Sequence, residues 1–102
     1  MHYVLGNSSD FKKILEKDIV LVDFFATWCG PCRMLGPELE KLCEENPDIN
    51  VLKVDVDEYP EIAADFNVSS IPFMVLFRNG KPVANTLGYK NATALKAWIN
   101  QN

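Results

Sequence analysis

The amino-acid sequence predicts an α/β fold, in which a mixed five-stranded sheet is flanked by four helices in the order β-α-β-α-β-α-β-β-α. Strand-like apolar runs at 19–26 and 51–56 are each followed by a helical pattern, as in β-α-β units. Later runs at 73–77 and 83–87 are joined by an Asn-Gly pair, which is a strong hairpin signal. The length of 102 residues, with 48% hydrophobic content, suits one domain spanning 1–102.

The start of the chain is expected to form a short N-terminal strand, a first helix and a central strand. Ser8 or Ser9 can cap the first helix, because a side-chain hydroxyl can accept a hydrogen bond from a free backbone N–H. Residues 19–26 are apolar on both alternating faces, which is typical of a strand covered on both sides. Asp23 is the exception in this run.

The remaining helices follow from periodicity and from their first residues. A long helix is expected after the Cys-Gly-Pro-Cys sequence at 29–32, since apolar side chains then recur at spacings of three and four. Pro60 can begin a short third helix, because proline is favoured at the first helical position. Asn91 can cap the last helix. Parallel β-α-β units followed by an antiparallel hairpin give a mixed sheet with helices on both faces.

Charge and composition exclude several functions. The net charge of −4 offers no general basic field for a nucleic acid. No segment approaches the 18 apolar residues of a membrane span, and the N-terminus lacks the features of a signal peptide. We therefore expect a protein of the reducing cytoplasm that binds neither nucleic acid nor membrane. Three cysteines there cannot form a disulfide framework, so they are free, metal-binding or redox-active.

Cys29 and Cys32 have the spacing of a redox pair. Cys29 is expected at the N-terminus of the long helix, where unpaired N–H groups and the helix dipole favour a thiolate. The thiolate is the nucleophile of disulfide exchange, and a second thiol three residues on can reach a mixed disulfide formed there. We predict that an exposed Cys29 attacks and that a more buried Cys32 resolves. Pro31 restricts the backbone between them.

A C-x-x-C sequence can also be half of a metal site, or two cysteines without a redox role. The other candidate ligands are Cys43 and the single histidine, His2, and neither supplies a second pair at a usual spacing. We therefore predict no metal. Cys43 follows Cys32 by eleven helical residues, roughly 16 Å at the helical rise, which is beyond disulfide reach. It is expected to be a small core residue.

Asp23 is the second candidate for chemistry. A carboxylate inside a strand buried on both faces is costly to ionise, so its pKa is expected to rise. Lying six residues before the first cysteine, it suits a proton acceptor for Cys32, although a hydrated aspartate at a strand end is the alternative. Lys53 on the neighbouring strand is either the ammonium that modulates Asp23 or a lysine that faces solvent.

Two further features surround the cysteine pair. Trp28 precedes Cys29 directly, and it can pack inward, form part of an exposed apolar platform for partner proteins, or do both. The Ile71-Pro72 step precedes a strand, and a cis bond is possible at such a step. The residues alone leave the isomer open.

With these features assembled, the chain resembles the thioredoxin family over almost its whole length. The resemblance is carried by the segment 22–37, VDFFATWCGPCRMLGP, by Ile71-Pro72 and by the order of the predicted elements. It implies the thioredoxin fold and a disulfide chemistry performed by Cys29 and Cys32. In that family, the residues matching Asp23 and Lys53 assist proton transfer.

The same resemblance implies a place for substrate. Pro72 should be cis and lie against the active-site disulfide, beside a shallow groove for an extended segment of the substrate protein. The residues implied to bind substrate are Trp28, Gly30, Pro31, Ile71, Pro72 and Gly88. Two positions depart from the family pattern and bear on partner choice: Phe25 stands where many members have tryptophan, and Phe73 where threonine is common.

The activity implied is that of a protein-disulfide reductase serving electron transport and cell redox homeostasis. Gly-Pro between the cysteines is similar to reducing members, whereas isomerases and oxidants usually carry a histidine there. No cofactor is expected on the domain, because electrons would come from NADPH through a flavin-containing thioredoxin reductase. Partners would be that reductase and disulfide-containing proteins, and we expect a monomer. A thioredoxin-like binding module and an oxidant or isomerase are the alternatives.

Overall fold

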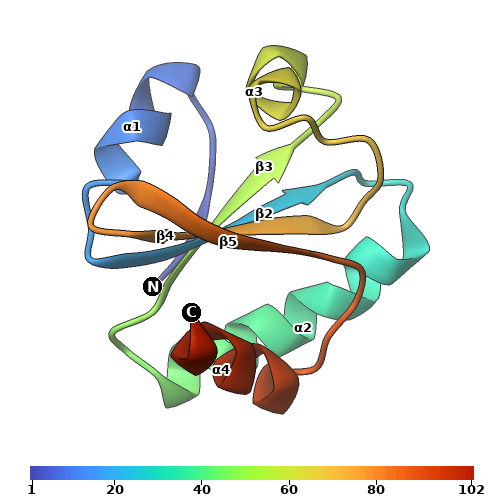
Figure 1. Ribbon diagram of the computed structural model, residues 1–102. Coiled ribbons are helices and arrows are strands. Elements are labelled where there is room, and N and C mark those ends of the chain that lie inside the picture. The colour runs from blue at the N-terminus through green and yellow to red at the C-terminus, as the bar shows by residue number, and fades with distance from the viewer.

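A twisted five-stranded sheet runs through the middle of the computed structural model, which describes residues 1–102 (Figure 1). The helices lie on both of its faces, so the predicted fold class and element order are confirmed. The strands are β1 (His2–Val4), β2 (Ile19–Phe25), β3 (Asn50–Asp55), β4 (Phe73–Arg78) and β5 (Lys81–Leu87). The helices are α1 (Phe11–Ile14), α2 (Gly30–Glu45), α3 (Pro60–Asp65) and α4 (Ala92–Gln101), with a 3-10 turn at Ser8–Asp10.

The sheet has the strand order β1-β3-β2-β4-β5. The first three strands in this order are parallel, while β4 pairs antiparallel with both β2 and β5. The predicted hairpin turn has φ of 52° at Asn79 and 81° at Gly80. Two positive φ angles in a two-residue turn match the right-handed twist of the flanking strands, which is why Asn-Gly is favoured there.

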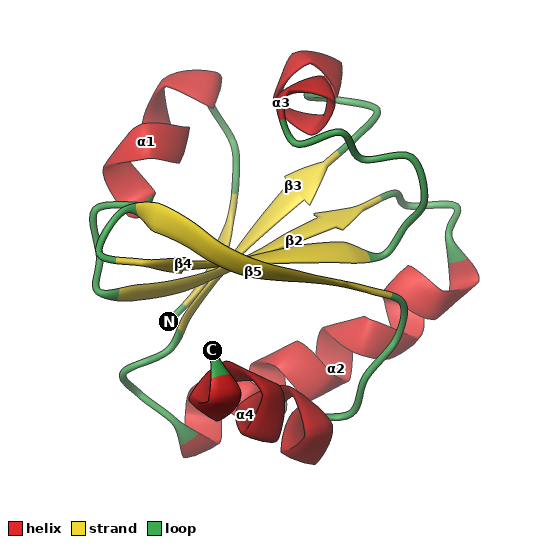
Figure 2. Ribbon diagram, in the orientation of Figure 1, coloured by secondary structure: helices red, strands yellow, loops and turns green.

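Figure 2 shows the three layers, with α1 and α3 over one face of the sheet and α2 and α4 over the other. Successive side chains of a strand point to opposite faces, so β2 contributes to both cores. Val20, Val22 and Phe24 join the cluster beneath α1 and α3, whereas Leu21 joins the cluster formed with α2 and α4. The prediction of a central strand covered on both sides is confirmed, and Asp23 is fully buried within it.

The predicted starts of the later helices are also confirmed. Pro60 is the first residue of α3, and the Asn91 side chain accepts a hydrogen bond of 2.8 Å from the N–H of Ala94. β5 begins two residues earlier than predicted, at Lys81. Its second residue, Pro82, is tolerated because β5 is an edge strand and one side of it needs no N–H donors.

The predicted cap of the first helix is wrong. Neither Ser8 nor Ser9 caps it; instead the Asn7 side chain accepts a 3.0 Å hydrogen bond from the N–H of Ser9. Asparagine competes well for this role because its side-chain oxygen reaches a backbone N–H two residues on. A 3-10 turn therefore comes first, and α1 proper has only four residues.

Candidate functional site

The two cysteines lie where the chain leaves β2 and enters α2. Cys29 is the N-cap of α2, with an extended backbone at φ −85° and ψ 114°. Its Sγ accepts a hydrogen bond of 3.3 Å from the N–H of Cys32. The first cysteine thus takes the place of the usual serine or aspartate cap, and its sulfur faces the unpaired N–H groups of the first turn. The predicted position of Cys29 at the helix N-terminus is confirmed.

Cys29 and Cys32 form a disulfide, with their Cα atoms 5.2 Å apart. The expectation of an exposed Cys29 beside a buried Cys32 needs correction, since their exposed fractions are 6% and 2%. Ala26 and Ile71 pack against the closed pair. Access to the first sulfur is therefore narrow in the oxidised form.

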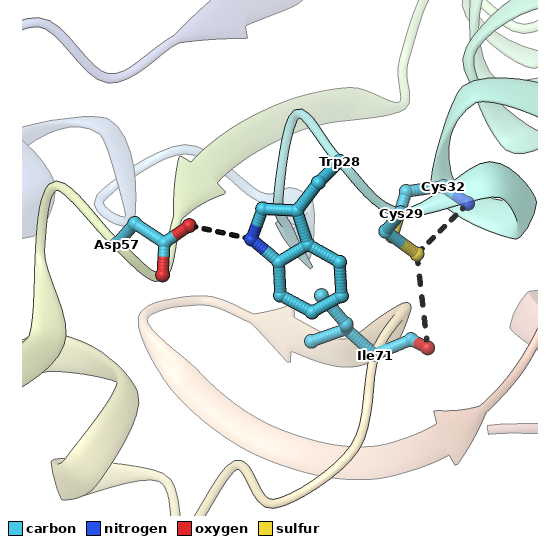
Figure 3. The surroundings of a disulfide bond; sticks show 5 residues. All are labelled: Trp28, Cys29, Cys32, Asp57 and Ile71. Atoms are coloured by element: carbon cyan, nitrogen blue, oxygen red, sulfur yellow. Dashed lines mark hydrogen bonds between the residues drawn. A yellow bond between two sulfur atoms is a disulfide. The ribbon is translucent and has the colours of Figure 1, made fainter.

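Figure 3 shows the indole of Trp28 between Asp57 and the disulfide. Trp28 is 68% exposed, and its indole Nε1–H donates a 2.8 Å hydrogen bond to Oδ2 of Asp57. Asp57 follows β3, and β2 and β3 are parallel, so the segments after both strands meet at one edge of the sheet. Of the alternatives for Trp28, the exposed platform agrees with this geometry, because the ring is held by its hydrogen bond to Asp57 and not by burial.

The Ile71-Pro72 bond is cis, as the resemblance implied. The carbonyl oxygen of Ile71 lies 4.0 Å from Sγ of Cys29, which places this step against the disulfide (Figure 3). The N–H of Gly88 donates a 2.8 Å hydrogen bond to the carbonyl oxygen of Pro72. Gly88 has a φ of 94°, a conformation that favours glycine. These backbone segments thus lie together beside the two sulfurs.

Asp23 is fully buried, and neither of its carboxylate oxygens has a hydrogen-bond partner in the protein. Burial raises its pKa to about 7, against the smaller opposing effect of the Lys53 charge. The upward shift agrees with the sequence-based expectation, and a hydrated aspartate at a strand end does not describe this interior position. Its strand neighbour Leu21 and its register partner Met74 belong to the core under α2. The carboxyl therefore faces the helix that begins with the cysteines.

Lys53 is the register partner of Asp23 across β2 and β3. It is half-buried, and its Nζ lies 4.5 Å from the centre of the Phe25 ring. A surface hollow of about 250 Å³ adjoins this contact. The hollow is lined by Phe25, Ala26, Thr27, Cys32, Arg33 and Lys53. Lys53 is thus partly open to solvent, and its charge also lowers the pKa of Asp23, so both alternatives for this residue remain.

Comparison with known proteins decides the family. The thioredoxin family model matches residues 3–101. The chain belongs to the thioredoxin family. It is 43% identical to thioredoxin of Chlamydia trachomatis over 96 residues, covering 94% of each chain. It is 44% identical to thioredoxin-1 of Saccharomyces cerevisiae, covering 93% of this chain and 92% of that one. A solved thioredoxin variant from Halobacterium salinarum superposes with a TM-score of 0.91 at 37% identity, covering 98% and 88% of the two chains.

Membership of the thioredoxin family, together with the bonded cysteine pair, makes the protein a thiol-disulfide oxidoreductase that reduces protein disulfides. Its substrates are disulfide-containing proteins. No helix is long and apolar enough to cross a membrane.

Sequence reasoning missed several residues around the thioredoxin site. Asp57 received no role, although its position after the strand beside β2 is a signal that could have been used. The cation–π contact of Phe25 with Lys53 depends on a register that no local pattern reveals. Exposed apolar side chains also went unmentioned: Met34 in α2, and Leu87 and Tyr89 on either side of Gly88.

The prediction that Cys43 is a small core residue is only partly right, because it packs against the core under α2 and α4 without being buried in it. Its side chain is partly exposed, and its Sγ lies 3.6 Å from the carbonyl oxygen of Met1, to which the thiol donates. The buried positions of α2 are Cys32, Leu35, Leu39 and Leu42, so Cys43 falls at the margin of the apolar stripe. Desolvation by its partial burial raises the pKa of the Cys43 thiol, which makes it a poor nucleophile. No cluster of three or more metal-ligating side chains is present.

Proposed function

We propose that Cys29 is the attacking thiolate, that Cys32 resolves the mixed disulfide and that Asp23 receives the proton of Cys32. One observation carries this assignment: a buried carboxyl without a hydrogen-bond partner lies on the strand that leads into the cysteine loop, facing the helix that begins there. Its pKa of about 7 lets it hold or release a proton at neutral pH.

In the first step, the Cys29 thiolate attacks one sulfur of the substrate disulfide. A bond forms between that sulfur and Cys29 Sγ, the substrate S–S bond breaks, and the leaving thiolate takes a proton from solvent. The N–H of Cys32, which donates to Cys29 Sγ in the oxidised form, supports the negative charge before attack. The helix N-terminus adds to this support.

In the second step, the Cys32 thiol gives its proton to the Asp23 carboxylate and attacks Cys29 Sγ. The mixed disulfide breaks, the second substrate sulfur leaves as a thiolate and is protonated, and the Cys29–Cys32 disulfide forms. Two electrons have passed from the dithiol to the substrate. Lys53 stabilises the ionised form of Asp23 and so favours its role as acceptor.

The substrate segment binds in the groove beside the disulfide. Trp28 supplies an exposed apolar surface on one side, and the cis Ile71-Pro72 step with Gly88 supplies the other. Gly30 and Pro31 carry no bulky polar group that would block the approach to Cys29. The unpaired backbone N–H and C=O groups of an extended substrate segment would form hydrogen bonds with backbone atoms in this groove. Extended peptides bind in this way to the exposed edges of sheets.

The oxidised pair is returned to the dithiol by a flavin-containing thioredoxin reductase, which draws its two electrons from NADPH. The domain then works as a monomeric carrier in electron transport and redox homeostasis of a reducing compartment, the cytoplasm. The Gly-Pro between the cysteines agrees with this role.

The test is reduction of insulin disulfides by dithiothreitol, followed by turbidity. The wild type should accelerate the reaction, whereas Cys29→Ser should not. Cys43→Ser is the matched control, since it removes the free thiol and should keep the wild-type rate. Cys32→Ser should accumulate a mixed disulfide with the substrate, visible by mass.

Equal rates for wild type and Cys29→Ser would remove the reductase assignment and favour a module that binds without turnover. Equilibration of the cysteine pair with glutathione distinguishes the remaining alternative, because an oxidant or isomerase would be largely reduced at glutathione ratios that leave this pair oxidised.

A further inference from the structure

The ammonium of Lys53 has two hollows within its reach. One is the hollow of about 250 Å³ that Lys53 shares with Phe25 and Cys32. The other, of about 660 Å³, lies on the opposite side of the lysine between β1 and α2, and its lining includes His2 and Glu40. In the structure, Nζ lies over the Phe25 ring, 4.5 Å from its centre, and so occupies the first of these two sides.

The position of Phe25 follows from strand geometry. It is two residues beyond Asp23 on β2, so both side chains point to the same face of the sheet. Lys53 is directly opposite Asp23, and therefore Phe25 is its diagonal neighbour, a separation that an aromatic ring and a long side chain can bridge. An ammonium within about 6 Å of a ring centre is attracted to the ring face.

Several charged groups surround Lys53, and without the ring they would attract or repel its ammonium in different directions. Glu40 and Glu44 of α2 line the far hollow and attract the ammonium, while Arg33 at the near hollow repels it. His2 of β1 is close enough for Lys53 to lower the pKa of its imidazole. Asp55 is the next residue on the same face of β3 and the register partner of Phe25, so its carboxylate attracts the ammonium to the same side as the ring. β4 presents only the uncharged Met74 to Asp23. The ring is the group that Nζ contacts in the structure, on the side of the cysteines and opposite Asp55.

We propose that Phe25 is a positioning residue, whose ring holds the Lys53 ammonium beside Asp23 and so keeps a positive charge next to the carboxyl that accepts the proton of Cys32. The inference rests on the proposed role of Asp23. Phe25 packs against the cluster that contains the two cysteines, but its effect on Asp23 is exerted through Lys53. Without the ring, the ammonium moves toward Glu40, and Asp23 loses part of the charge that favours its ionised form.

The test is an NMR titration of the Asp23 carboxyl carbon in the disulfide form, in which Cys29 and Cys32 do not titrate. Lys53→Met should raise the midpoint of this titration. Phe25→Leu should raise it by a part of the shift that Lys53→Met produces, because the ring acts on Asp23 only through the position of the ammonium. Phe25→Trp should keep the wild-type midpoint or lower it, because tryptophan is the better partner for a cation.

The double variant separates positioning from packing. Phe25→Leu combined with Lys53→Met should have the midpoint of Lys53→Met alone, since a ring without an ammonium has nothing to hold. Phe66→Leu removes an aromatic ring from the opposite core and should leave the midpoint unchanged. Phe25→Met, whose unbranched and flexible side chain fills irregular gaps in a core, serves in the same way if the leucine variant does not fold.

Unchanged midpoints in both Phe25→Leu and Phe25→Met, with a raised one in Lys53→Met, would overturn the positioning role. An unchanged midpoint in Lys53→Met would also overturn it, because the lysine would then not act on Asp23. These results are independent of the insulin assay, in which failure of Cys29→Ser to lose activity would overturn the proposed function and leave the titration intact.

Discussion

Replacement of Asp23 by asparagine should stabilise the protein at neutral and alkaline pH and lose this effect in acid. The pKa of the carboxyl is about 7 in the folded protein and has an ordinary value of 3.8. Because the folded value is the higher one, stability present below pH 3.8 is lost as the pH rises through about 7. The difference corresponds to about 4 kcal/mol at most, of which about 3 kcal/mol falls between roughly pH 4.5 and 8.5.

The assay is chemical denaturation of wild type and Asp23→Asn at several pH values, both as the disulfide form. The disulfide keeps Cys29 and Cys32 from titrating, so the change in the difference between the two proteins belongs to Asp23. Asparagine has nearly the same shape, and its buried amide adds only an offset that does not vary with pH. Asp48→Asn alters an exposed carboxyl and is the control; its difference from wild type should stay nearly constant.

A difference between wild type and Asp23→Asn that changes by less than about 1 kcal/mol over this range would refute the reasoning. It would mean that Asp23 does not ionise near neutral pH as its burial requires. The proposed proton transfer from Cys32 would then lose its acceptor as well, since the same pKa underlies both.

Three further changes have expected outcomes. Asn91→Ala removes the cap of α4 and should lower the free energy of unfolding by about 1 kcal/mol, measured by denaturation, with insulin reduction unchanged. Gly88→Ala should cost about 1–2 kcal/mol in the same measurement, because φ is 94°. Nothing lies within 4 Å of the added Cβ, so a larger loss would point to a clash that the structure does not contain. Asp57→Ala frees the Trp28 indole and should raise KM for insulin roughly threefold, with the rate on a small aromatic disulfide preserved.

The elements of the fold could be predicted because their signals are local. The apolar run of β2, the Asn-Gly turn and the Asn91 cap each determine the conformation of residues close to them in the sequence. The first helix shows the limit of such signals. Three consecutive polar residues, at 7–9, can each cap a helix, and the choice of Asn7 depends on which side chain reaches an N–H once the chain has turned.

The residues of the candidate site also divide into those with a local signal in the sequence and those without one. Cys29, Cys32 and Asp23 could be found because a C-x-x-C pair and one carboxyl in an apolar strand are conspicuous in the sequence itself. The face of the sheet on which Lys53 lies could not be predicted. Side chains of a strand alternate between the two faces, and the register of β3 against β2 must be known before Lys53 can be assigned to one of them. The contacts of Trp28 with Asp57 and of Lys53 with Phe25 join segments 28 or more residues apart.

Asp23 is the only charged residue among the buried ones, and both cores beside it are apolar. An apolar or neutral residue there would give a more stable domain, so the carboxyl needs an explanation other than stability. A carboxyl of ordinary pKa would stay ionised at neutral pH and could accept the proton of Cys32 only weakly. With a pKa of about 7, Asp23 can take that proton during resolution and return it when the pair is reduced again. Lys53 opposes the effect of burial on this pKa, and under the proposed mechanism the place of its ammonium therefore matters to the proton transfer.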